Sequence, residues 1–212
     1  MNPLLILLLI GAGWVFLKGK AADQGASKEA PADANGMLAS VLAPSLTDTA
    51  QLQKFFSYFT AAIGNQATPQ TTLRLSLYAM VTALKIAMLG KGAQPNADEL
   101  LALAYAPSSG MGGIQQLPDA PADAQQAAYA ALVDTQTNVG TIGQYIQAIA
   151  QASQNPALSV AQKKRLVAYM LAMKAKQMML AGGNNFTSPA YFAIANMANV
   201  PTIAPNSIFA YQ

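Results

Sequence analysis

Apolar residues recur at three- and four-residue spacing through most of the chain after residue 36, a pattern typical of amphipathic helices. Prolines and glycines mark where these helices begin and end, and the predicted N-terminal caps are Ser45 or Thr47, Thr68, Asn96 and Ser159. Signals for strands are sparse. The pattern therefore predicts an all-α protein with a single N-terminal transmembrane helix, a flexible tether and a multi-helix, bundle-like domain. One expected helix ends near residue 63. The others span residues 69–90, 97–106, 121–137, 141–153, 160–181 and 188–198.

The segment 69–90 is apolar on most of its faces, but it contains two cations. Only ten residues separate Arg74 from Lys85, and a charge at the centre of a bilayer costs a few kcal/mol or more. We therefore interpret this segment as the central helix of the folded domain rather than as a membrane span.

The first seventeen residues form the predicted membrane anchor. An uncharged run from Pro3 to Leu17 would extend roughly 22 Å as a helix, and Lys18 and Lys20 can reach the nearer interface. These cations follow the run and favour a cytoplasmic location for residues 18–212. The predicted anchor residues are Leu4, Leu5, Ile6, Leu7, Leu8, Leu9, Ile10, Trp14, Val15, Phe16 and Leu17.

Two alternatives to an anchor remain open for this segment. A cleaved signal peptide would carry its positive charges before the apolar run, whereas here they follow it. A helix buried in protein or in an oligomer is the other alternative. We expect a single-pass membrane protein, in a virion membrane or capsid if the chain is viral and in a bacterial inner membrane otherwise.

Three further segments follow the anchor. Residues 18–36 contain no large apolar side chain and are predicted to be a flexible tether. Residues 37–199 form the predicted helical domain, and residues 200–212 an extended tail. Within the domain, the proline- and glycine-rich stretch 107–123 is the longest expected loop, either a simple spacer or a partner-contact loop.

Composition removes several chemistries. The chain has no histidine and no cysteine, which excludes disulfides, zinc sites built on these residues and Ser–His–Asp catalysis. No phosphate-binding glycine loop follows a strand, because SSGMGG lacks both the preceding strand and a following lysine. We therefore expect no cofactor, no metal and no catalytic residue.

Acidic residues offer no recognisable catalytic pair. Asp98 and Glu99 follow Asn96 in the first turn of an expected helix, where negative charge favours the helix dipole. Glu99 is the only glutamate beyond the tether and is thus the single candidate for a general acid in a small helical cell-wall hydrolase. The other candidate carboxylates are Asp48, Asp119, Asp123 and Asp134.

Charge is distributed unevenly along the chain. Residues 135–212 contain five basic residues and no acidic one. A basic helix that is rich in methionine can contact anionic lipid or a nucleic-acid backbone, whereas a solvated face on a core helix is the simpler interpretation. The predicted phosphate or anionic-surface contacts are Lys163, Lys164, Arg165, Lys174 and Lys176.

The C-terminal tail combines prolines with large apolar side chains. Pro201 and Pro205 prevent a continuing helix, yet apolar residues follow them. Such side chains at an irregular terminus usually dock, on the same chain or on a neighbouring subunit. The predicted partner contacts are Ile208, Phe209 and Tyr211.

With only 10% charged residues, the chain is less charged than an isolated soluble domain usually is. We expect a non-enzymatic, membrane-anchored structural protein that contacts a lipid bilayer and other subunits of an assembly. A bacteriophage virion component, either a membrane-associated minor capsid protein or a DNA-delivery protein, fits these features. A bacterial membrane-anchored scaffold or secretion-system component is the alternative, and a helical hydrolase is the third.

Overall fold

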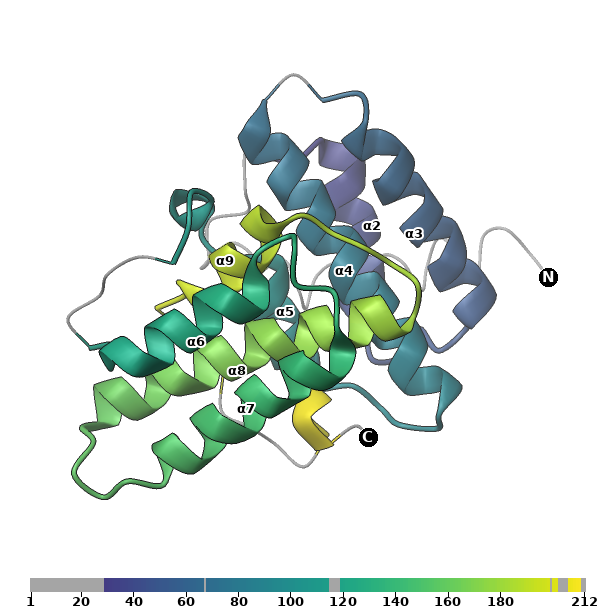
Figure 1. Cartoon of the computed structure of the whole chain (residues 1–212). Coiled ribbons are helices and arrows are strands. Elements are labelled where there is room, and N and C mark those ends of the chain that lie inside the picture. The colour runs from purple at the N-terminus through teal and green to yellow at the C-terminus, as the bar shows by residue number, and fades with distance from the viewer. Residues whose placement is uncertain (1–28, 67, 115–118, 199, 202–205, 211–212) are drawn as a thin grey trace, which may run out of the picture. The chain divides into compact units, whose positions relative to one another are not determined.

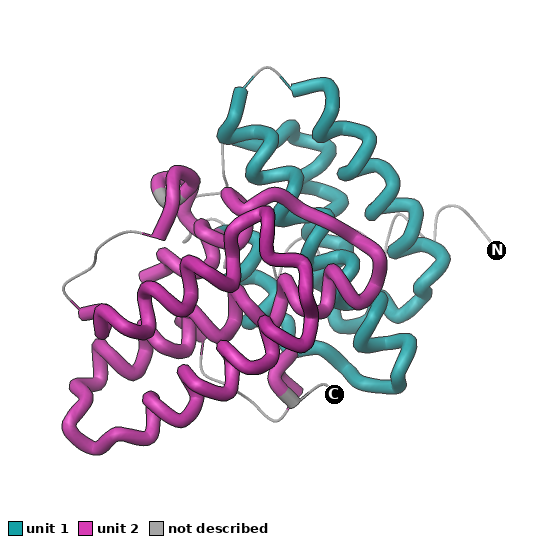
Figure 2. The backbone as a smooth tube through the Cα atoms, viewed as in Figure 1, with its two compact units in different colours: residues 1–105 teal, residues 106–212 magenta. Residues whose placement is uncertain are grey.

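The computed structural model describes residues 29–66, 68–114, 119–198, 200–201 and 206–210. These residues form eight α-helices and two short 3-10 helices, with no β-strand among them (Figure 1). The predicted all-α fold is confirmed for this part of the chain. The chain divides into two compact units, residues 1–105 and 106–212, where the sequence had predicted one helical domain (Figure 2).

Unit 1 is built around its longest helix, α4. Its helices are α2 (Ala32–Leu42), α3 (Thr49–Ile63), α4 (Pro69–Gly90) and α5 (Ala97–Ala104). Helix α3 packs along α4, and α2 and α5 pack against α4 as well. Side chains of Asp48, Thr68 and Asn96 cap the N-termini of α3, α4 and α5, which confirms Thr68 and Asn96 as the predicted caps and replaces Ser45 or Thr47 by Asp48.

Unit 2 is built in the same way around α8. Its helices are α6 (Ala122–Leu132), α7 (Val139–Ser153), α8 (Val160–Ala181) and α9 (Ser188–Ala195), with the 3-10 helices η1 (Ser108–Gly110) and η2 (Ile208–Ala210). Helices α6, α7 and α9 and the 3-10 helix η2 all pack against α8. The predicted cap Ser159 forms a capping box with Gln162 at the start of α8.

The two units repeat one another. The helices of unit 1 have 11, 15, 22 and 8 residues, and those of unit 2 have the same lengths in the same order. Each helix of unit 2 begins 90 or 91 residues after its equivalent in unit 1. In both units the longest helix is the one that the others contact most. Residues 32–195, as far as the structure describes them, therefore contain two copies of one four-helix unit.

The central helices are buried because they are apolar on nearly every face. All residues of α4 from Leu73 to Lys85 are buried, as is most of α8 beyond Arg165. Among the described residues, α4 is the one helix long and apolar enough to cross a membrane. Most of its apolar stretch lies inside the structure, in agreement with its interpretation as a central helix.

The beginning of unit 1 differs from the prediction. Helix α2 starts at Ala32, so the last five residues of the expected tether, 32–36, are helical. Proline is well suited to a helix N-terminus, where Pro31 lies, and the small Ala34 is fully buried. A buried face made of alanine gives little hydrophobic signal in the sequence, so the predicted tether extends five residues too far. The predicted anchor, residues 1–17, lies outside the described residues.

Candidate functional site

Each central helix carries two buried cations in its own unit. Arg74 and Lys85 are 5% and 2% exposed, and their equivalents Arg165 and Lys176 are 6% and 1% exposed. The two cations of each helix are eleven positions apart, which is close to three full turns at 3.6 residues per turn. Both cations of a unit therefore project from the same side of its central helix.

The lysine in each unit holds the C-terminal end of the first helix. Lys85 Nζ donates hydrogen bonds to the carbonyl oxygens of Val41 (2.7 Å) and Ala43 (2.8 Å), at the end of α2. In unit 2, Lys176 Nζ donates to the carbonyl oxygens at the end of α6, those of Ala131 (3.1 Å) and Val133 (2.7 Å). The last carbonyl groups of a helix lack intrahelical partners and carry partial negative charge. The ammonium group of the lysine supplies both the missing hydrogen-bond donors and a compensating positive charge.

The arginine of unit 1 performs the same task at the end of its last helix. Arg74 Nη1 donates to the carbonyl oxygen of Ala104 (2.7 Å), the last residue of α5. Its Nη2 also forms an ion pair with Glu29 (2.9 Å), just before α2. The guanidinium group therefore ties together the end of the unit and the segment by which the chain enters it.

Unit 2 reproduces this arrangement. Arg165 Nη1 donates to the carbonyl oxygens of Ala195 (2.9 Å), which ends α9, and of Met197 (3.1 Å). Its Nε lies 3.5 Å from a carboxylate oxygen of Asp119, which is the equivalent of Glu29. The repeat thus extends from helix lengths to the partners of individual side chains.

Burial changes the proton affinity of these groups. Removal from water lowers the pKa of Lys85 to about 8. Burial also lowers the pKa of Lys176, while the negative charge of Asp134 raises it. Burial raises the pKa of Tyr169, on the same helix, to about 12.

Acidic side chains are used in a similar structural way. Asp48 accepts hydrogen bonds from the amides of Ala50 and Gln51 at the start of α3. Asp134 accepts from both the amide and the hydroxyl group of Ser188, at 2.6 and 2.7 Å, and so caps α9 from another part of unit 2. Within the described residues, no group of three or more acidic side chains is placed to hold a metal ion.

Glu99, the residue on which the hydrolase alternative depends, lies in the first turn of α5. Only 2% of Glu99 is exposed. Its backbone amide donates to the side chain of the Asn96 cap. A general acid must reach the proton acceptor of a substrate, so this burial gives the hydrolase alternative no support.

The structure separates the five predicted phosphate contacts into two sets. Arg165 and Lys176 are core residues, and their hydrogen bonds to helix carbonyls explain their burial. Lys163 and Lys174 are half-buried, and Lys164 is exposed. The correction is that Arg165 and Lys176 are not surface groups. Contact of Lys163, Lys164 and Lys174 with phosphate stays a prediction.

The described part of the C-terminal tail docks on its own unit. Ile208, in η2, is fully buried, and η2 packs against α8. Phe209 is half-buried, and Tyr211 lies outside the described residues. Of the two alternatives for the tail, the structure shows docking on the same chain for Ile208, which is therefore not available to a partner.

Sequence reasoning had missed the repeat and, with it, the buried cations. The signal was present in the sequence. Residues 30–34 and 120–124 both have the sequence Ala-Pro-Ala-Asp-Ala. Both central helices contain the pattern Arg-Leu-x-x-Tyr followed, after six residues, by Lys-x-x-Met-Leu-x-x-Gly, at 74–92 and 165–183. Comparison of the chain with itself at an offset of 90 or 91 residues finds both.

Comparison with other proteins adds no relative to this description. No family model, no curated protein and no solved structure matches the chain.

Proposed function

We propose that the chain is a non-enzymatic, membrane-anchored structural component of a larger assembly. This proposal rests on one observation: buried cations hold helix ends in the same way in both units. The four buried cations all hold helix ends, and two of them also pair with carboxylates that precede the first of the four helices in each unit, α2 or α6. These four cations are thus engaged in holding the repeated fold rather than in contact with a substrate.

The exposed faces of helices α3 and α7 also support a role in an assembly. Helix α7 exposes a row of uncharged side chains at helical spacing, and α3 exposes a single lysine, Lys54, among small and polar residues. Sparse charge on helix faces favours close packing against other protein surfaces over free solvation. The exposed residues of the row on α7 are Gln144, Gln147, Ala148, Gln151 and Ala152.

A bacteriophage virion component is the form of this proposal that we favour, as a membrane-associated minor capsid or DNA-delivery protein. The predicted anchor in residues 1–17 and the paired helical units together suit a protein that links a membrane to a protein shell. A bacterial membrane-anchored scaffold or secretion-system component is the alternative. Both require a membrane-bound protein that associates with other subunits.

Membrane fractionation tests the anchor. Carbonate extraction of cells that express the full chain should leave it in the membrane pellet, and removal of residues 1–20 should release it to the supernatant. Recovery of the full chain in the supernatant would contradict membrane anchoring. Far-UV circular dichroism of the released protein should show helical structure, which controls for aggregation.

The two assemblies are distinguished by where the native protein is found. An antibody against the chain should label purified virus particles if it is a virion component. Labelling of the envelope of uninfected cells, with none of particles, would favour the cellular scaffold. A monodisperse monomer in detergent that enters neither particles nor envelope complexes would contradict the structural proposal itself.

A further inference from the structure

The two units differ at the turn between the second and third of their four helices, which are α3 and α4 in unit 1 and α7 and α8 in unit 2. In unit 2 this turn and the start of α8, residues 154–164, form what we name the α7–α8 tip. Val160, the first residue of α8, is 73% exposed, the largest exposed fraction among the large apolar side chains described. Pro156 and Ala157 just before it are exposed as well. The end of unit 2 therefore presents an apolar surface to its surroundings.

Two lysines lie one turn behind this apolar surface. Lys163 is half-buried and Lys164 is exposed. Helical side chains lean toward the N-terminus of their helix, which directs both ammonium groups toward the tip. The equivalent positions in unit 1 are Thr72 and Leu73, neither of which carries a charge. Because the units share their interior, this difference sets the α7–α8 tip apart from its repeat.

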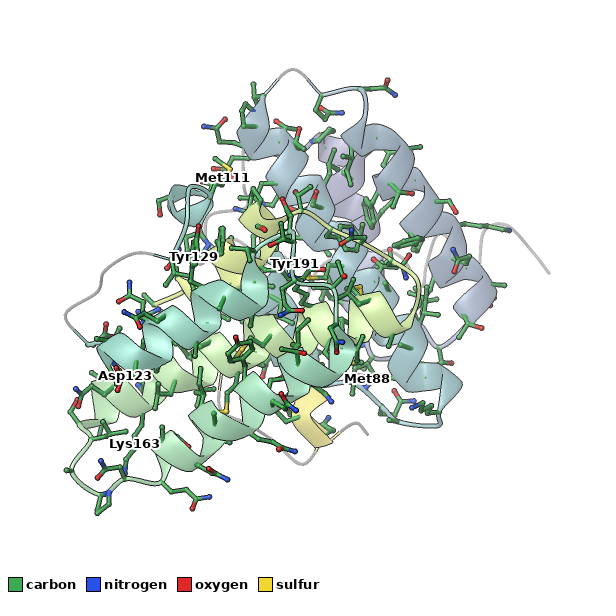
Figure 3. All side chains as sticks on the ribbon, viewed as in Figure 1. Met88, Met111, Asp123, Tyr129, Lys163 and Tyr191 are labelled. Atoms are coloured by element: carbon green, nitrogen blue, oxygen red, sulfur yellow. The ribbon has the colours of Figure 1, made fainter. Side chains whose placement is uncertain are left out.

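Carboxylates at the same end of unit 2 moderate this positive charge. The carboxylate of Asp119 lies beside the buried guanidinium group of Arg165, so the two charges offset one another. Asp123 is exposed in the first turn of α6, and Figure 3 shows Asp123 and Lys163 at the same end of the unit. No acidic residue occurs in the sequence after Asp134. The tip thus has a small excess of positive charge next to exposed apolar side chains.

We propose that the α7–α8 tip docks on the surface of an anionic lipid bilayer. In this arrangement Val160 and its apolar neighbours enter the headgroup region, and Lys163 and Lys164 bind lipid phosphates. Basic residues that flank an exposed apolar edge are typical of interfacial membrane contacts. A nucleic-acid backbone would satisfy the lysines equally well, but it offers Val160 no apolar environment. The exposed valine therefore favours lipid.

This contact is separate from the predicted N-terminal anchor. Each lysine near an anionic surface contributes about fivefold to the docking equilibrium, so the tip alone binds weakly. On a protein already held at the membrane, the second contact becomes intramolecular and gains from high effective concentration. The proposal deepens the membrane-associated function proposed above and relies on it for tight binding, although the tip can be tested whether or not the anchor spans a bilayer.

A single fluorescent label tests the proposal on the full chain. The protein has no cysteine, so Val160→Cys gives one site for an environment-sensitive dye. Gln70→Cys is the matched control, because Gln70 is exposed just after the start of α4 and Ala161, its equivalent, is exposed in α8. Both labelled proteins are reconstituted with vesicles of phosphatidylcholine alone or of phosphatidylcholine mixed with phosphatidylglycerol.

We expect a blue shift of the dye at position 160 in vesicles that contain phosphatidylglycerol, and none at position 70. The double variant Lys163→Gln/Lys164→Gln should shift the docking equilibrium toward the free tip by about fivefold for each lysine. The control variant Lys54→Gln/Lys91→Gln removes the same charge elsewhere and should have little effect. Asp123→Asn should strengthen docking, whereas Asp48→Asn, which keeps a good helix cap, should not.

Several results would overturn the proposal. They are no shift at position 160, an equal shift in pure phosphatidylcholine, or an unchanged shift in the double lysine variant whose circular dichroism is native. A shift with duplex DNA but not with vesicles would assign the lysines to nucleic acid instead. Carbonate extraction of the same vesicles reports on the anchor independently, so failure of the tip and failure of the anchor are distinguishable.

Discussion

Arginine at the sixth position of each central helix joins the two ends of its unit. Its guanidinium group contacts the last carbonyl of the final helix and a carboxylate that precedes the first helix. A buried polar group left without a partner costs about 1–3 kcal/mol. Each arginine therefore stabilises its unit by satisfying a carbonyl group at the end of the last helix and a carboxylate before the first one.

Replacement of this arginine by methionine tests that role. Arg74→Met and Arg165→Met each keep an apolar stem and remove the donors, so each should lower the free energy of unfolding by about 2–3 kcal/mol. Urea denaturation followed by circular dichroism measures the change. Lys54→Met, at an exposed position, should stay within about 0.5 kcal/mol of the parent. Equal changes in the free energy of unfolding for all three substitutions would show that the contacts of Arg74 and Arg165 do not stabilise the units.

The buried lysines make the free energy of unfolding depend on pH in the alkaline range. The folded pKa of Lys85 is about 8, below its ordinary value of 10.5. Between these values the unfolded chain binds more protons than the folded one, so stability rises with pH, by up to about 2 kcal/mol between pH 8 and 10. Above pH 10 the raised pKa of Tyr169, about 12, has the opposite effect, since only the unfolded chain has lost that proton.

We therefore expect the free energy of unfolding to reach its maximum near pH 10. Denaturation in urea at a series of pH values measures this profile. The double variant Lys85→Met/Lys176→Met should lose most of the rise above pH 8, whatever its stability at neutral pH. A rise that persists in the double variant would mean that other groups cause it.

At the scale of the helices, sequence signals predicted the elements well where capping chemistry was explicit. The starts of α4 and α8 follow from Thr68-Pro69 and from Ser159, and both were predicted. The start of α2 was not, because its buried face begins with alanine. Periodicity also says nothing of which carbonyl a buried lysine will meet, since Val41 lies 44 residues from Lys85 along the chain.

The glycine that follows each central helix is a test at this scale. Gly92 and Gly183 occupy equivalent positions and have φ angles of 77° and 74°, in the left-handed region that glycine adopts without strain. Gly92→Ala should therefore destabilise the protein by about 1 kcal/mol. Gly90, two residues earlier, ends α4 in open space, and its equivalent is Ala181.

Gly90→Ala should consequently change stability in the opposite direction. Alanine restricts the unfolded chain and favours the helix, which stabilises by about 0.5 kcal/mol. Thermal denaturation of the two variants side by side measures the difference in sign. Destabilisation by both substitutions would contradict the assignment of the helix end.

At the scale of the whole molecule, the sequence predicted one domain where the structure has two units. Hydrophobic periodicity is a local signal, and it cannot show that residues 29–105 and 119–210 form separate cores. The repeat in the sequence carries that information, through Arg74 and Arg165 and through the two Ala-Pro-Ala-Asp-Ala segments. Roles of surface residues were hardest to predict, because two of the five basic side chains in the last third are buried.

Hydrogen exchange measured by mass spectrometry should report the two units separately. Each unit has its own buried central helix and its own arginine, and local stability follows local burial and hydrogen bonding. Arg74→Met should therefore accelerate exchange mainly in α2, α4 and α5, and Arg165→Met mainly in α6, α8 and α9. Uniform acceleration across both units by either variant would show that the chain unfolds as one cooperative body.

The identical segments at 30–34 and 120–124 bear on how this chain can change in length. Loss of residues 30–119 by recombination between the two copies would join Glu29 to Ala120 and leave the sequence around the junction unaltered. Glu29 would then stand in the position of Asp119, as the carboxylate beside Arg165. The number of four-helix units can thus fall from two to one without a new sequence at the junction. The same exchange in reverse adds a third unit in register.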